Sequence, residues 1–313
     1  MKNIKPPSKS AIRFATLFLS SAVSTWSSAY AEEADKALHD QLPDQIKSAG
    51  VIRMGGAYES LPHLNADPQD ATKPVGIAPD IVSHLAPILG VKMDWVNTAW
   101  PGQIPGLRSG SLDVLMGQIS VTPDREKALM DFVPYYKSTS GALVPAGNPN
   151  HVTSDVTSLC GLTIGAPAGS LMEKELTGIS KKYCEPAGKG DIKMVFFPSA
   201  SAASVSVLSG QSQAYYESYM TTRGIAKASD SRLEAVSMNY DQTKEWNPGL
   251  YGLAVTKDNP GLTKAILVAM QKIVADGSYK AALDKYDAGS GALSADEVKI
   301  NPLTNTPVGE VAH

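Results

Sequence analysis

The sequence predicts an α/β protein with two units of alternating strands and helices. Short strand-type apolar runs alternate with helical patterns between residues 51 and 110, and the same alternation recurs between residues 162 and 226. A further strand-like run, residues 251–255, can carry the chain back toward the first unit. Strand–helix–strand order is typical of a parallel sheet with helices on its faces. With 43% hydrophobic residues, the 313-residue chain can bury one large core or two smaller ones.

Residues 1–31 have the features of a cleaved secretory signal peptide. A basic segment with Lys2, Lys5, Lys9 and Arg13 precedes a short apolar core at residues 14–23, and Ala29-Tyr30-Ala31 is a small-x-small cleavage site. The core is too short and too rich in serine to cross a bilayer as a helix, although an uncleaved N-terminal anchor is the alternative. No cysteine lies near the cleavage site, so a lipoprotein anchor is not expected.

The exported part of the chain is acidic. Residues 32–313 contain 24 Lys and Arg against 31 Asp and Glu, a formal charge of −7, without a basic run. This balance argues against nucleic acid as a partner. The two cysteines, Cys160 and Cys184, are expected to form a disulfide in an oxidising compartment, with two buried thiols as the alternative. We assign that disulfide to stability.

The elements of the first unit follow from apolar spacing and from the positions of Gly and Pro. In chain order we expect a lead-in turn or short helix at residues 32–47, a strand at 51–54 ending in Gly55-Gly56, a polar loop at 57–74, a helix at 79–89 stopped by Gly90, a strand at 91–96, a loop at Trp100, a short helix at 104–107 and a strand at 113–119. Pro87 removes a backbone donor, so the last turn of the longer helix is expected to fray.

Residues 134–144 are expected to cross into the second unit. There, strands at 162–164, 194–197 and 214–217 alternate with helices that begin at Ser170 and span 200–208 and 218–226, and helices at 262–274 and 279–286 follow the returning strand. Ser170 and Glu173 have the spacing of a capping box. The tail beyond Ala288 is rich in Gly, Pro, Asn and Asp and is expected to be extended and partly mobile.

The stretch from Gly117 to Tyr136 is the strongest candidate for a binding site. Thr122-Pro123-Asp124 combines a hydroxyl N-cap, a proline in the first turn and an acid, which predicts a helix start. The preceding strand would deliver Ser120 and Arg125 to that terminus. Free backbone N–H groups there favour an anion, and a guanidinium holds a carboxylate through two parallel hydrogen bonds. The alternative is an ordinary solvated or salt-bridged arginine.

The sequence offers little for catalysis, and no cofactor or metal is expected. Neither a phosphate-binding loop nor a nucleophile elbow is present. The five histidines are scattered without metal-ligand spacing: His39, His63, His84, His151 and His313.

Several stretches together resemble a known family. They are G-I-A-P-D-I at 76–81, A-W-P-G-Q-I-P-G-L-R-S-G-S-L-D-V at 99–114, S-V-T-P-D-R and D-F-V-P-Y-Y within 120–136, I-G-A-P-A-G-S at 164–170, Y-G-L-A-V at 251–255 and A-D-G-S-Y-K-A-A-L-D-K-Y at 275–286. In this order and spacing, over essentially the whole exported chain, they resemble the polar amino-acid class of periplasmic solute-binding proteins of ABC importers (family 3 type).

The resemblance implies a type II periplasmic binding protein. In that fold two α/β lobes, each a mixed β-sheet flanked by helices, are joined by two hinge strands and close on a ligand. Lobe 1 would comprise residues 32–140 plus 252–313, and lobe 2 residues 141–251. The resemblance also implies a periplasmic monomer that captures a small carboxylate-bearing solute, an amino acid or a similar compound, and delivers it to an inner-membrane ABC permease.

The resemblance also assigns ligand contacts. Arg125 would grip the α-carboxylate of the ligand, helped by the hydroxyl and amide of Ser120. Amides at Gly169 and Ser170 would add to this grip from the second lobe.

The other end of the ligand has its own expected contacts. The ring of Trp100 would pack on the ligand side chain, and the backbone carbonyl of Gln118 would accept from the ligand ammonium. The acids that the family usually places near the ligand ammonium are replaced in this chain, as described below. This suggests a ligand that depends less on a charged amine, or one with a flat group stacked on Trp100.

The chain departs from the family pattern in the first strand and its loop. Ala57 and Ser60 stand at the positions of a usual acid and a clamp aromatic, and Tyr58 lies close enough to replace the aromatic.

A second departure concerns the acid that balances the ligand ammonium. Ser218 stands at its usual position, and Glu217, one residue earlier, points to the opposite face unless a bulge or the strand end re-aims it. A buried unpaired ammonium is unfavourable. Either Glu59 or Glu217 therefore supplies the counter-charge, or the ligand is not an ordinary α-amino acid.

Three functions fit these residues. The first is a receptor that hands its solute to a permease. The second is an enzyme that resembles the periplasmic cyclohexadienyl dehydratases, in which a cleft acid, Glu217 or Glu59, would protonate a departing hydroxyl while Arg125 holds a carboxylate. The third is a chemosensory protein that docks onto a receptor.

Overall fold

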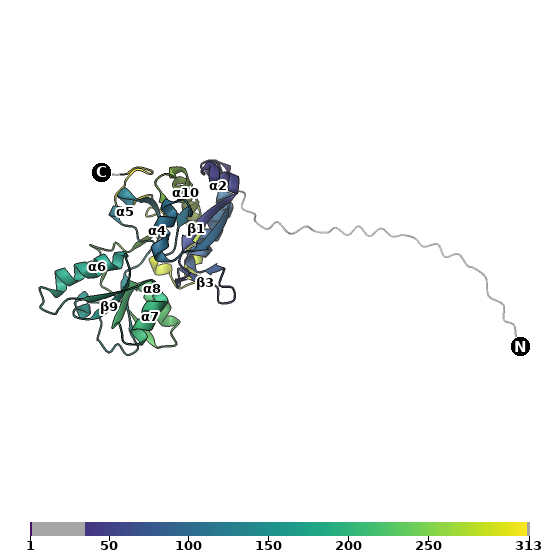
Figure 1. Cartoon of the computed structure of the whole chain (residues 1–313). Coiled ribbons are helices and arrows are strands. Elements are labelled where there is room, and N and C mark those ends of the chain that lie inside the picture. Colours follow the sequence, from purple (N-terminus) through teal and green to yellow (C-terminus); the bar gives the residue numbers. More distant parts are fainter. Residues whose placement is uncertain (2–34, 312–313) are drawn as a thin grey trace. The chain divides into compact units, whose positions relative to one another are not determined.

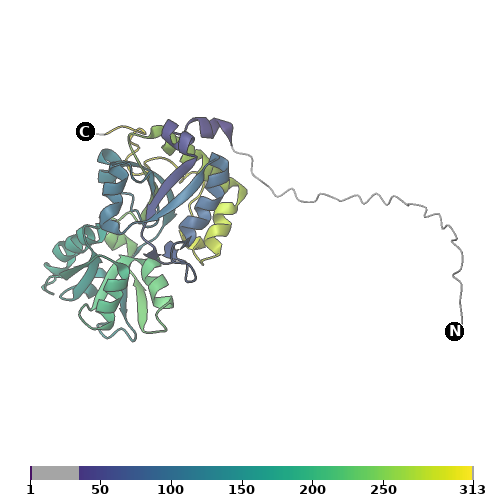
Figure 2. The same cartoon turned by 45° about the vertical axis from the view of Figure 1, so that its right-hand side comes forward.

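The described part of the chain forms two α/β lobes, each built on a five-stranded mixed sheet (Figure 1). This computed structural model describes Met1 and residues 35–311, so the predicted signal peptide, apart from Met1, lies outside the described residues. The helices α4, α5 and α10 lie with β1 in lobe 1, and α6, α7 and α8 lie with β9 in lobe 2. The turned view separates the same two groups (Figure 2). The predicted two-lobed fold is confirmed.

The sheet of lobe 1 has the strand order β5-β1-β6-β13-β7. Its strands are β1 (Val51–Gly56), β5 (Lys92–Asn97), β6 (Val114–Leu115), β7 (Met130–Lys137) and β13 (Leu250–Thr256). β1 is parallel to β5 and β6, whereas β13 is antiparallel to β6 and β7. A small antiparallel sheet contains β2 (Glu59–Ser60), β3 (Leu64–Ala66) and β4 (Pro74–Val75). The last strand of the chain thus pairs between two strands that precede lobe 2.

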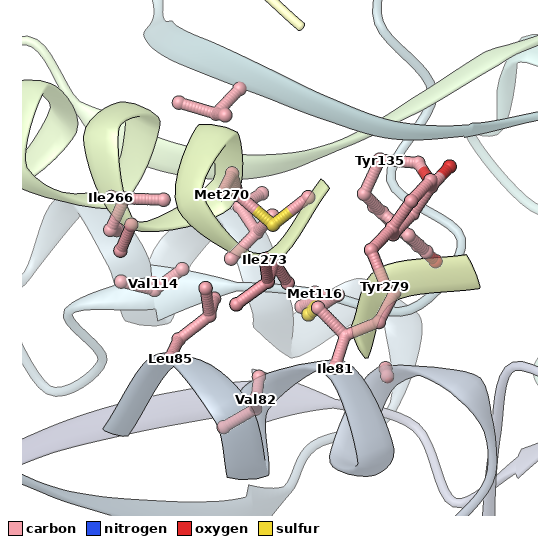
Figure 3. Close-up of a cluster of buried hydrophobic side chains, with 14 of the residues drawn as sticks. Ile81, Val82, Leu85, Val114, Met116, Tyr135, Ile266, Met270, Ile273 and Tyr279 are labelled. Atoms are coloured by element: carbon pink, nitrogen blue, oxygen red, sulfur yellow. The ribbon is translucent and has the colours of Figure 1, made fainter. Parts of the chain in front are cut away.

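Helices cover the lobe 1 sheet and bury its main core. They are α1 (Lys36–Asp40), α2 (Asp44–Ala49), α3 (Ile77–Leu89), α4 (Trp100–Arg108), α5 (Pro123–Ala128), α10 (Pro260–Asp276), α11 (Ser278–Asp284) and the 3-10 turn η3 (Gly289–Gly291). Figure 3 shows Ile81 and Leu85 of α3 directed toward Met270 and Ile273 of α10, beside Tyr279 of α11. Each fully buried side chain of this size contributes about 1.5–3 kcal/mol.

The sheet of lobe 2 has the strand order β10-β9-β11-β8-β12. Its strands are β8 (Ser140–Pro145), β9 (Thr163–Pro167), β10 (Lys193–Phe197), β11 (Ala214–Ser218) and β12 (Leu233–Ser237). Its helical segments are η1 (Val156–Leu159), α6 (Leu171–Ile179), η2 (Ser180–Cys184), α7 (Ala200–Leu208), α8 (Tyr219–Lys227) and α9 (Tyr240–Thr243). The predicted disulfide is confirmed, since Cys160 and Cys184 are bonded across a sequence separation of 24.

Two crossing segments join the sheets. The chain passes from β7 to β8 through Ser138 and Thr139, and it returns to β13 through residues 247–249. The backbone N–H of Ser138 donates to the carbonyl of Gly249 at 2.7 Å, so the two crossings are bonded to each other. Gly249 has φ 69°, and a Cβ atom there would lie 2.4 Å from the Ser138 oxygen. Only glycine allows this close approach.

Several local predictions of secondary structure are wrong. Trp100 begins helix α4 and does not lie in a loop, because Pro101 falls in the first turn, where proline is tolerated. The strand expected at residues 113–119 pairs only at Val114–Leu115.

The loosely extended tail expected beyond Ala288 is a further difference, since this segment packs on lobe 1. Asn301 is fully buried; its side chain accepts from the backbone N–H of Phe132 at 3.0 Å and donates to Asp131 Oδ1 at 2.8 Å. Within the described residues no helix has the length and apolarity to span a membrane.

Candidate functional site

A pocket lies between the two lobes and contains most of the predicted site residues. Lobe 1 supplies Ala57, Glu59, Trp100, Gln103, Met116, Gly117, Gln118, Ile119, Ser120 and Arg125; lobe 2 supplies Pro167, Ser170, Leu171, Met172, Pro198, Ser199, Ala200, Tyr215 and Glu217. The empty space, counted to the mouth, is about 740 Å³. The lining combines apolar side chains with a few polar groups, as in sites for small molecules.

Arg125 is the cation of the pocket. Thr122 caps α5, and its hydroxyl accepts from the backbone N–H of Arg125 at 3.3 Å, which fixes the start of the helix. The guanidinium Nη1 of Arg125 donates to the Ser120 carbonyl at 2.9 Å. Burial lowers the pKa of the guanidinium to about 10, and among the described residues no carboxylate forms a salt bridge with it. A desolvated cation without an anion favours an anionic ligand group.

Trp100 connects Arg125 to the second lobe. The guanidinium carbon of Arg125 lies 5.3 Å from the centroid of the Trp100 ring, within the range of a cation–π interaction. The indole Nε1 donates to the carbonyl of Ala168 in lobe 2 at 3.1 Å. Because Trp100 begins α4, its ring contacts both the guanidinium of Arg125 in lobe 1 and the backbone of lobe 2.

Ser170 offers an unused hydroxyl to the pocket. It precedes α6, but its side chain makes no capping hydrogen bond, and its hydroxyl is buried without a partner. The predicted capping box is therefore wrong in its serine half. Its glutamate half is shifted, because Glu173 Oε2 accepts from the backbone N–H of Gly169 at 3.0 Å. A buried hydroxyl without a partner can donate to a ligand.

Gln118 joins the lobes through its side chain. Its Nε2 donates to the Ser218 hydroxyl at 2.8 Å and to the Thr221 hydroxyl. Ser218 also caps α8, since its hydroxyl accepts from the backbone N–H of Thr221 at 3.2 Å. The Ser218 hydroxyl is thus engaged both by lobe 1 and by its own helix, and Ser218 does not line the pocket.

Glu217 and Tyr215 face the pocket from β11. They are two residues apart on one strand, so their side chains share a face. The sequence predicts that Glu217 faces the ligand only if a bulge or the strand end re-aims it; in the structure it lines the pocket, and its Oε1 accepts from the backbone N–H of Ser218 at 2.8 Å. Burial raises the pKa of Glu217 to about 7 and also raises the pKa of Glu59.

Residues 52–289 match the sequence profile of the bacterial extracellular solute-binding proteins, family 3. The chain belongs to this family. The match spans β1 to η3 and therefore includes both lobes and both crossings. Among the described residues of this family 3 protein, no group of three His, Cys, Asp or Glu side chains is placed to hold a metal ion.

Curated relatives of this family 3 protein are distant and cover most of both chains. The arginine-binding protein ArgT of Corynebacterium glutamicum is 22% identical over 83% of this chain and 81% of its own. A probable histidine-binding protein of Neisseria gonorrhoeae is 23% identical over 78% and 86%, respectively. The L-cystine-binding protein TcyJ of Escherichia coli is 24% identical over 78% and 85%.

Solved structures of similar proteins have the same fold. An ancestral arginine-binding protein bound to arginine has a TM-score of 0.66 and 26% identity, covering 76% of this chain and 98% of that one. The ancestral amino acid-binding protein AncCDT-1, a precursor of cyclohexadienyl dehydratase, has a TM-score of 0.63 and 24% identity over 78% and 98%. At this identity, the similarity to AncCDT-1 shows a shared fold only.

The structure brings six of the eight predicted ligand residues together. Trp100, Gln118, Ser120, Arg125, Ser170 and Glu217 line the pocket. Gly169 does not line the pocket, and its backbone N–H, the group expected to contact the ligand, donates to Glu173. Tyr58 borders a neighbouring groove, where its hydroxyl is buried without a partner.

Sequence reasoning missed three polar residues of the pocket, Gln103, Ser199 and Tyr215. Gln103 of α4 donates from Nε2 to the Thr98 carbonyl at 2.9 Å, which leaves its buried Oε1 without a partner. Tyr215 could have been found from the alternation of β11, because it lies two residues before Glu217. No pattern in the sequence indicates Gln103, because the predicted short helix at residues 104–107 begins after it, whereas α4 includes it.

Proposed function

We propose that this protein is the substrate-binding component of an amino-acid ABC importer, exported to the periplasm, and that it passes its ligand to the inner-membrane permease. The observation that carries the proposal is Arg125, a desolvated cation in the interlobe pocket with no carboxylate partner among the described residues. The printed names of three relatives, which bind arginine, histidine and cystine, support an amino acid or a similar compound as the ligand.

In this proposal the carboxylate of the ligand pairs with the guanidinium of Arg125. The unused Ser170 hydroxyl can donate a hydrogen bond to that carboxylate, the free Oε1 of Gln103 can accept one from an N–H group of the ligand, and Trp100 packs against the body of the ligand. Closure of the two lobes around the ligand then uses hydrogen bonds that join the lobes in the structure, including the one from Gln118 to Ser218. We further propose that the moving lobes are residues 32–140 with 252–313 and residues 141–251, and that the protein acts as a monomer without catalysis.

The test is a comparison of Arg125→Ala with Arg108→Ala. Arg108 ends α4 and is exposed outside the pocket, so it is the matched control. A ligand found by thermal-shift screening of amino acids should stabilise the wild type and the control by about 2.7 kcal/mol at 100 times its Kd. Arg125→Ala should lose this stabilisation while its unliganded melting temperature stays near that of the wild type. Retained affinity in Arg125→Ala would contradict the proposal.

A dehydratase is the second candidate, and one observation favours it. A carboxyl group with a pKa of about 7, as burial gives Glu217, is suited to donate a proton near neutral pH. Incubation with prephenate or arogenate distinguishes the two functions. Turnover that depends on Glu217 would establish an enzyme, whereas recovery of unchanged ligand from the saturated protein would support a receptor.

A further inference from the structure

Helix α5, which carries Arg125, has no apolar face. Its sequence over Pro123–Ala128 is Pro-Asp-Arg-Glu-Lys-Ala, and within this range Glu126 is the one buried side chain. A helix this short is not stable alone, and most helices in proteins are held in place by an apolar stripe. Because α5 lacks such a stripe, its position depends on the Thr122 cap at its start and on the groups that bind Glu126.

The carboxylate of Glu126 is bound by the tail segment, residues 301–309. Its Oε2 accepts from the backbone N–H of Thr304 at 2.8 Å and from the Thr304 hydroxyl at 2.7 Å. Its Oε1 accepts from the backbone N–H of Leu303 at 3.2 Å. The Glu126 side chain is fully buried, so these hydrogen bonds form away from water. Three hydrogen bonds to one carboxylate therefore take the place of an apolar face.

The tail segment is attached to lobe 1 independently of α5. The backbone N–H of Asn301 donates to the Phe132 carbonyl at 3.1 Å, and the side chain of Asn301 accepts from the Phe132 N–H at 3.0 Å. Leu303 packs on the same apolar cluster as Trp100, the aromatic residue of the pocket. The tail segment is thus a fixed support on which Glu126 can be held.

The direction of Arg125 depends on this support. Arg125 directly precedes Glu126, so their side chains leave α5 about 100° apart. The Glu126 side chain is buried in lobe 1, and the Arg125 side chain lines the pocket. A rotation of α5 about its axis would move both side chains together. The hydrogen bonds to Glu126 therefore also set the direction in which the guanidinium enters the pocket.

We propose that Glu126 and the tail segment position Arg125 for the carboxylate of the ligand, so that the C-terminal part of the chain belongs to the binding apparatus. Glu126 is a positioning residue, because it does not line the pocket and acts through its neighbour. The tail segment lies outside residues 52–289, which match the family profile, so that match does not account for it. The proposal rests on the proposed function, in which Arg125 holds the ligand.

Four variants test the support. Glu126→Gln turns an amide N–H₂ group toward the donors of Thr304, and Thr304→Val removes one donor with little change of shape. Thr304→Ser keeps the hydroxyl and should behave like the wild type. Glu297→Gln is the matched control. Glu297 also accepts three hydrogen bonds, from the N–H and hydroxyl of Ser294 and from Lys137, and neither partner belongs to α5 or lines the pocket.

The first measurement is calorimetric binding of L-arginine, L-histidine and L-cystine, the ligands in the names of three relatives. Glu126→Gln should weaken binding about tenfold and Thr304→Val about threefold, while Thr304→Ser and Glu297→Gln stay within about twofold of the wild type. In Arg125→Lys, whose ammonium lacks the planar fork, adding Glu126→Gln should weaken binding by less than about threefold, because the effect passes through the guanidinium.

The second measurement needs no ligand. Fluorine NMR of protein labelled with 5-fluorotryptophan observes the ring of Trp100, which Arg125 contacts. Glu126→Gln should shift or broaden the Trp100 resonance and leave that of Trp246 in lobe 2 unchanged, whereas Glu297→Gln should alter neither. If the wild type binds none of the three amino acids, this resonance alone decides.

Circular dichroism and the unliganded melting temperature will show which variants fold, and the two Thr304 variants decide if Glu126→Gln does not. Three results would overturn the positioning role: an unchanged affinity in Glu126→Gln, an equal loss in the Arg125→Lys background, or a Trp100 resonance that does not respond.

The outcome also separates this inference from the proposed function. If Arg125→Ala loses binding and Glu126→Gln keeps it, the receptor function stands and the positioning role fails. If Arg125→Ala binds every probe like the wild type, the proposed function itself fails.

Discussion

The guanidinium carbon of Arg125 lies 5.3 Å from the centroid of the Trp100 ring, and the same indole donates across the pocket to Ala168. The two contacts give Trp100 two separable tasks. The ring face stabilises the cation of lobe 1, and the ring N–H holds lobe 2. A ligand anion paired with Arg125 would therefore lie beside a ring that also contacts lobe 2 through Ala168.

Substitution of Trp100 separates these tasks. Trp100→Phe keeps an aromatic face beside Arg125 but removes the donor to Ala168, so affinity should fall by about 0.5–1.5 kcal/mol. Trp100→Ala also removes the cation–π contact and should lose about 0.5–2 kcal/mol more. Calorimetric titration measures both losses. Trp95→Phe in β5, outside the pocket, is the control and should bind normally; equal binding by wild type and Trp100→Ala would refute the role.

The disulfide should affect stability and not ligand binding. Cys160 and Cys184 close a loop with a sequence separation of 24 and lie outside the pocket. The loop-entropy relation gives about 3.5 kcal/mol for a loop of this length. Replacing both cysteines by serine should lower the free energy of unfolding in urea by about this amount while leaving the Kd unchanged. The wild type treated with a reductant should behave in the same way, and a change in Kd would show that lobe 2 rearranges.

The architecture could be predicted because both units follow simple periodic rules. Alternating strand and helix patterns, with Gly90 and the Thr122 cap as boundaries, mark the elements that hold Ser120 and Arg125 in place. Errors arose where a local rule had an exception. Pro101 looks like a helix breaker, but in the first turn it lacks only an N–H that would be unbonded anyway. Trp100 accordingly begins α4 and does not lie in the expected loop.

Contacts between distant polar residues could not be predicted. The bond from Gln118 to Ser218 spans 100 positions, and neither residue type nor spacing indicates it. The tail is a similar case, because its composition resembles a loose segment while Asn301 bonds to residues about 170 positions earlier. Which side of β11 meets the pocket also depends on the position of the other lobe, so the sequence could not decide between Glu217 and Ser218.

The packed tail depends on one buried carboxylate. Asp131 accepts from Lys257 Nζ at 2.9 Å, from Asn301 Nδ2 at 2.8 Å and from the backbone N–H of Gly309 at 2.8 Å. Asp131→Ala leaves a buried ammonium without its partner and should lower the free energy of unfolding by about 3–5 kcal/mol. Asp258→Ala, which removes an exposed carboxylate, should change it by less than about 0.5 kcal/mol. Similar urea midpoints for the two variants would contradict the importance of this network.

Stability should depend on pH through Glu217. Its surroundings contain Tyr215 on its own strand, Glu59 from lobe 1, the buried Glu175 of α6 and Tyr251 of β13, with no cation among the described groups that affect it. Burial raises the pKa of Glu217 from 4.5 to about 7 in the folded protein. The folded state therefore binds more protons than the unfolded state between these values. The free energy of unfolding should decrease as the pH rises through this window.

Glu217→Gln isolates this effect, because glutamine does not titrate and Glu175 is present in both proteins. The shift corresponds to about 3 kcal/mol, so the variant should gain up to this amount relative to the wild type between pH 4.5 and pH 7. Urea unfolding at pH 5, 6, 7 and 8, without ligand, measures the difference. Parallel stability curves would show that Glu217 is ionised in the empty pocket at all these pH values, which would contradict this prediction.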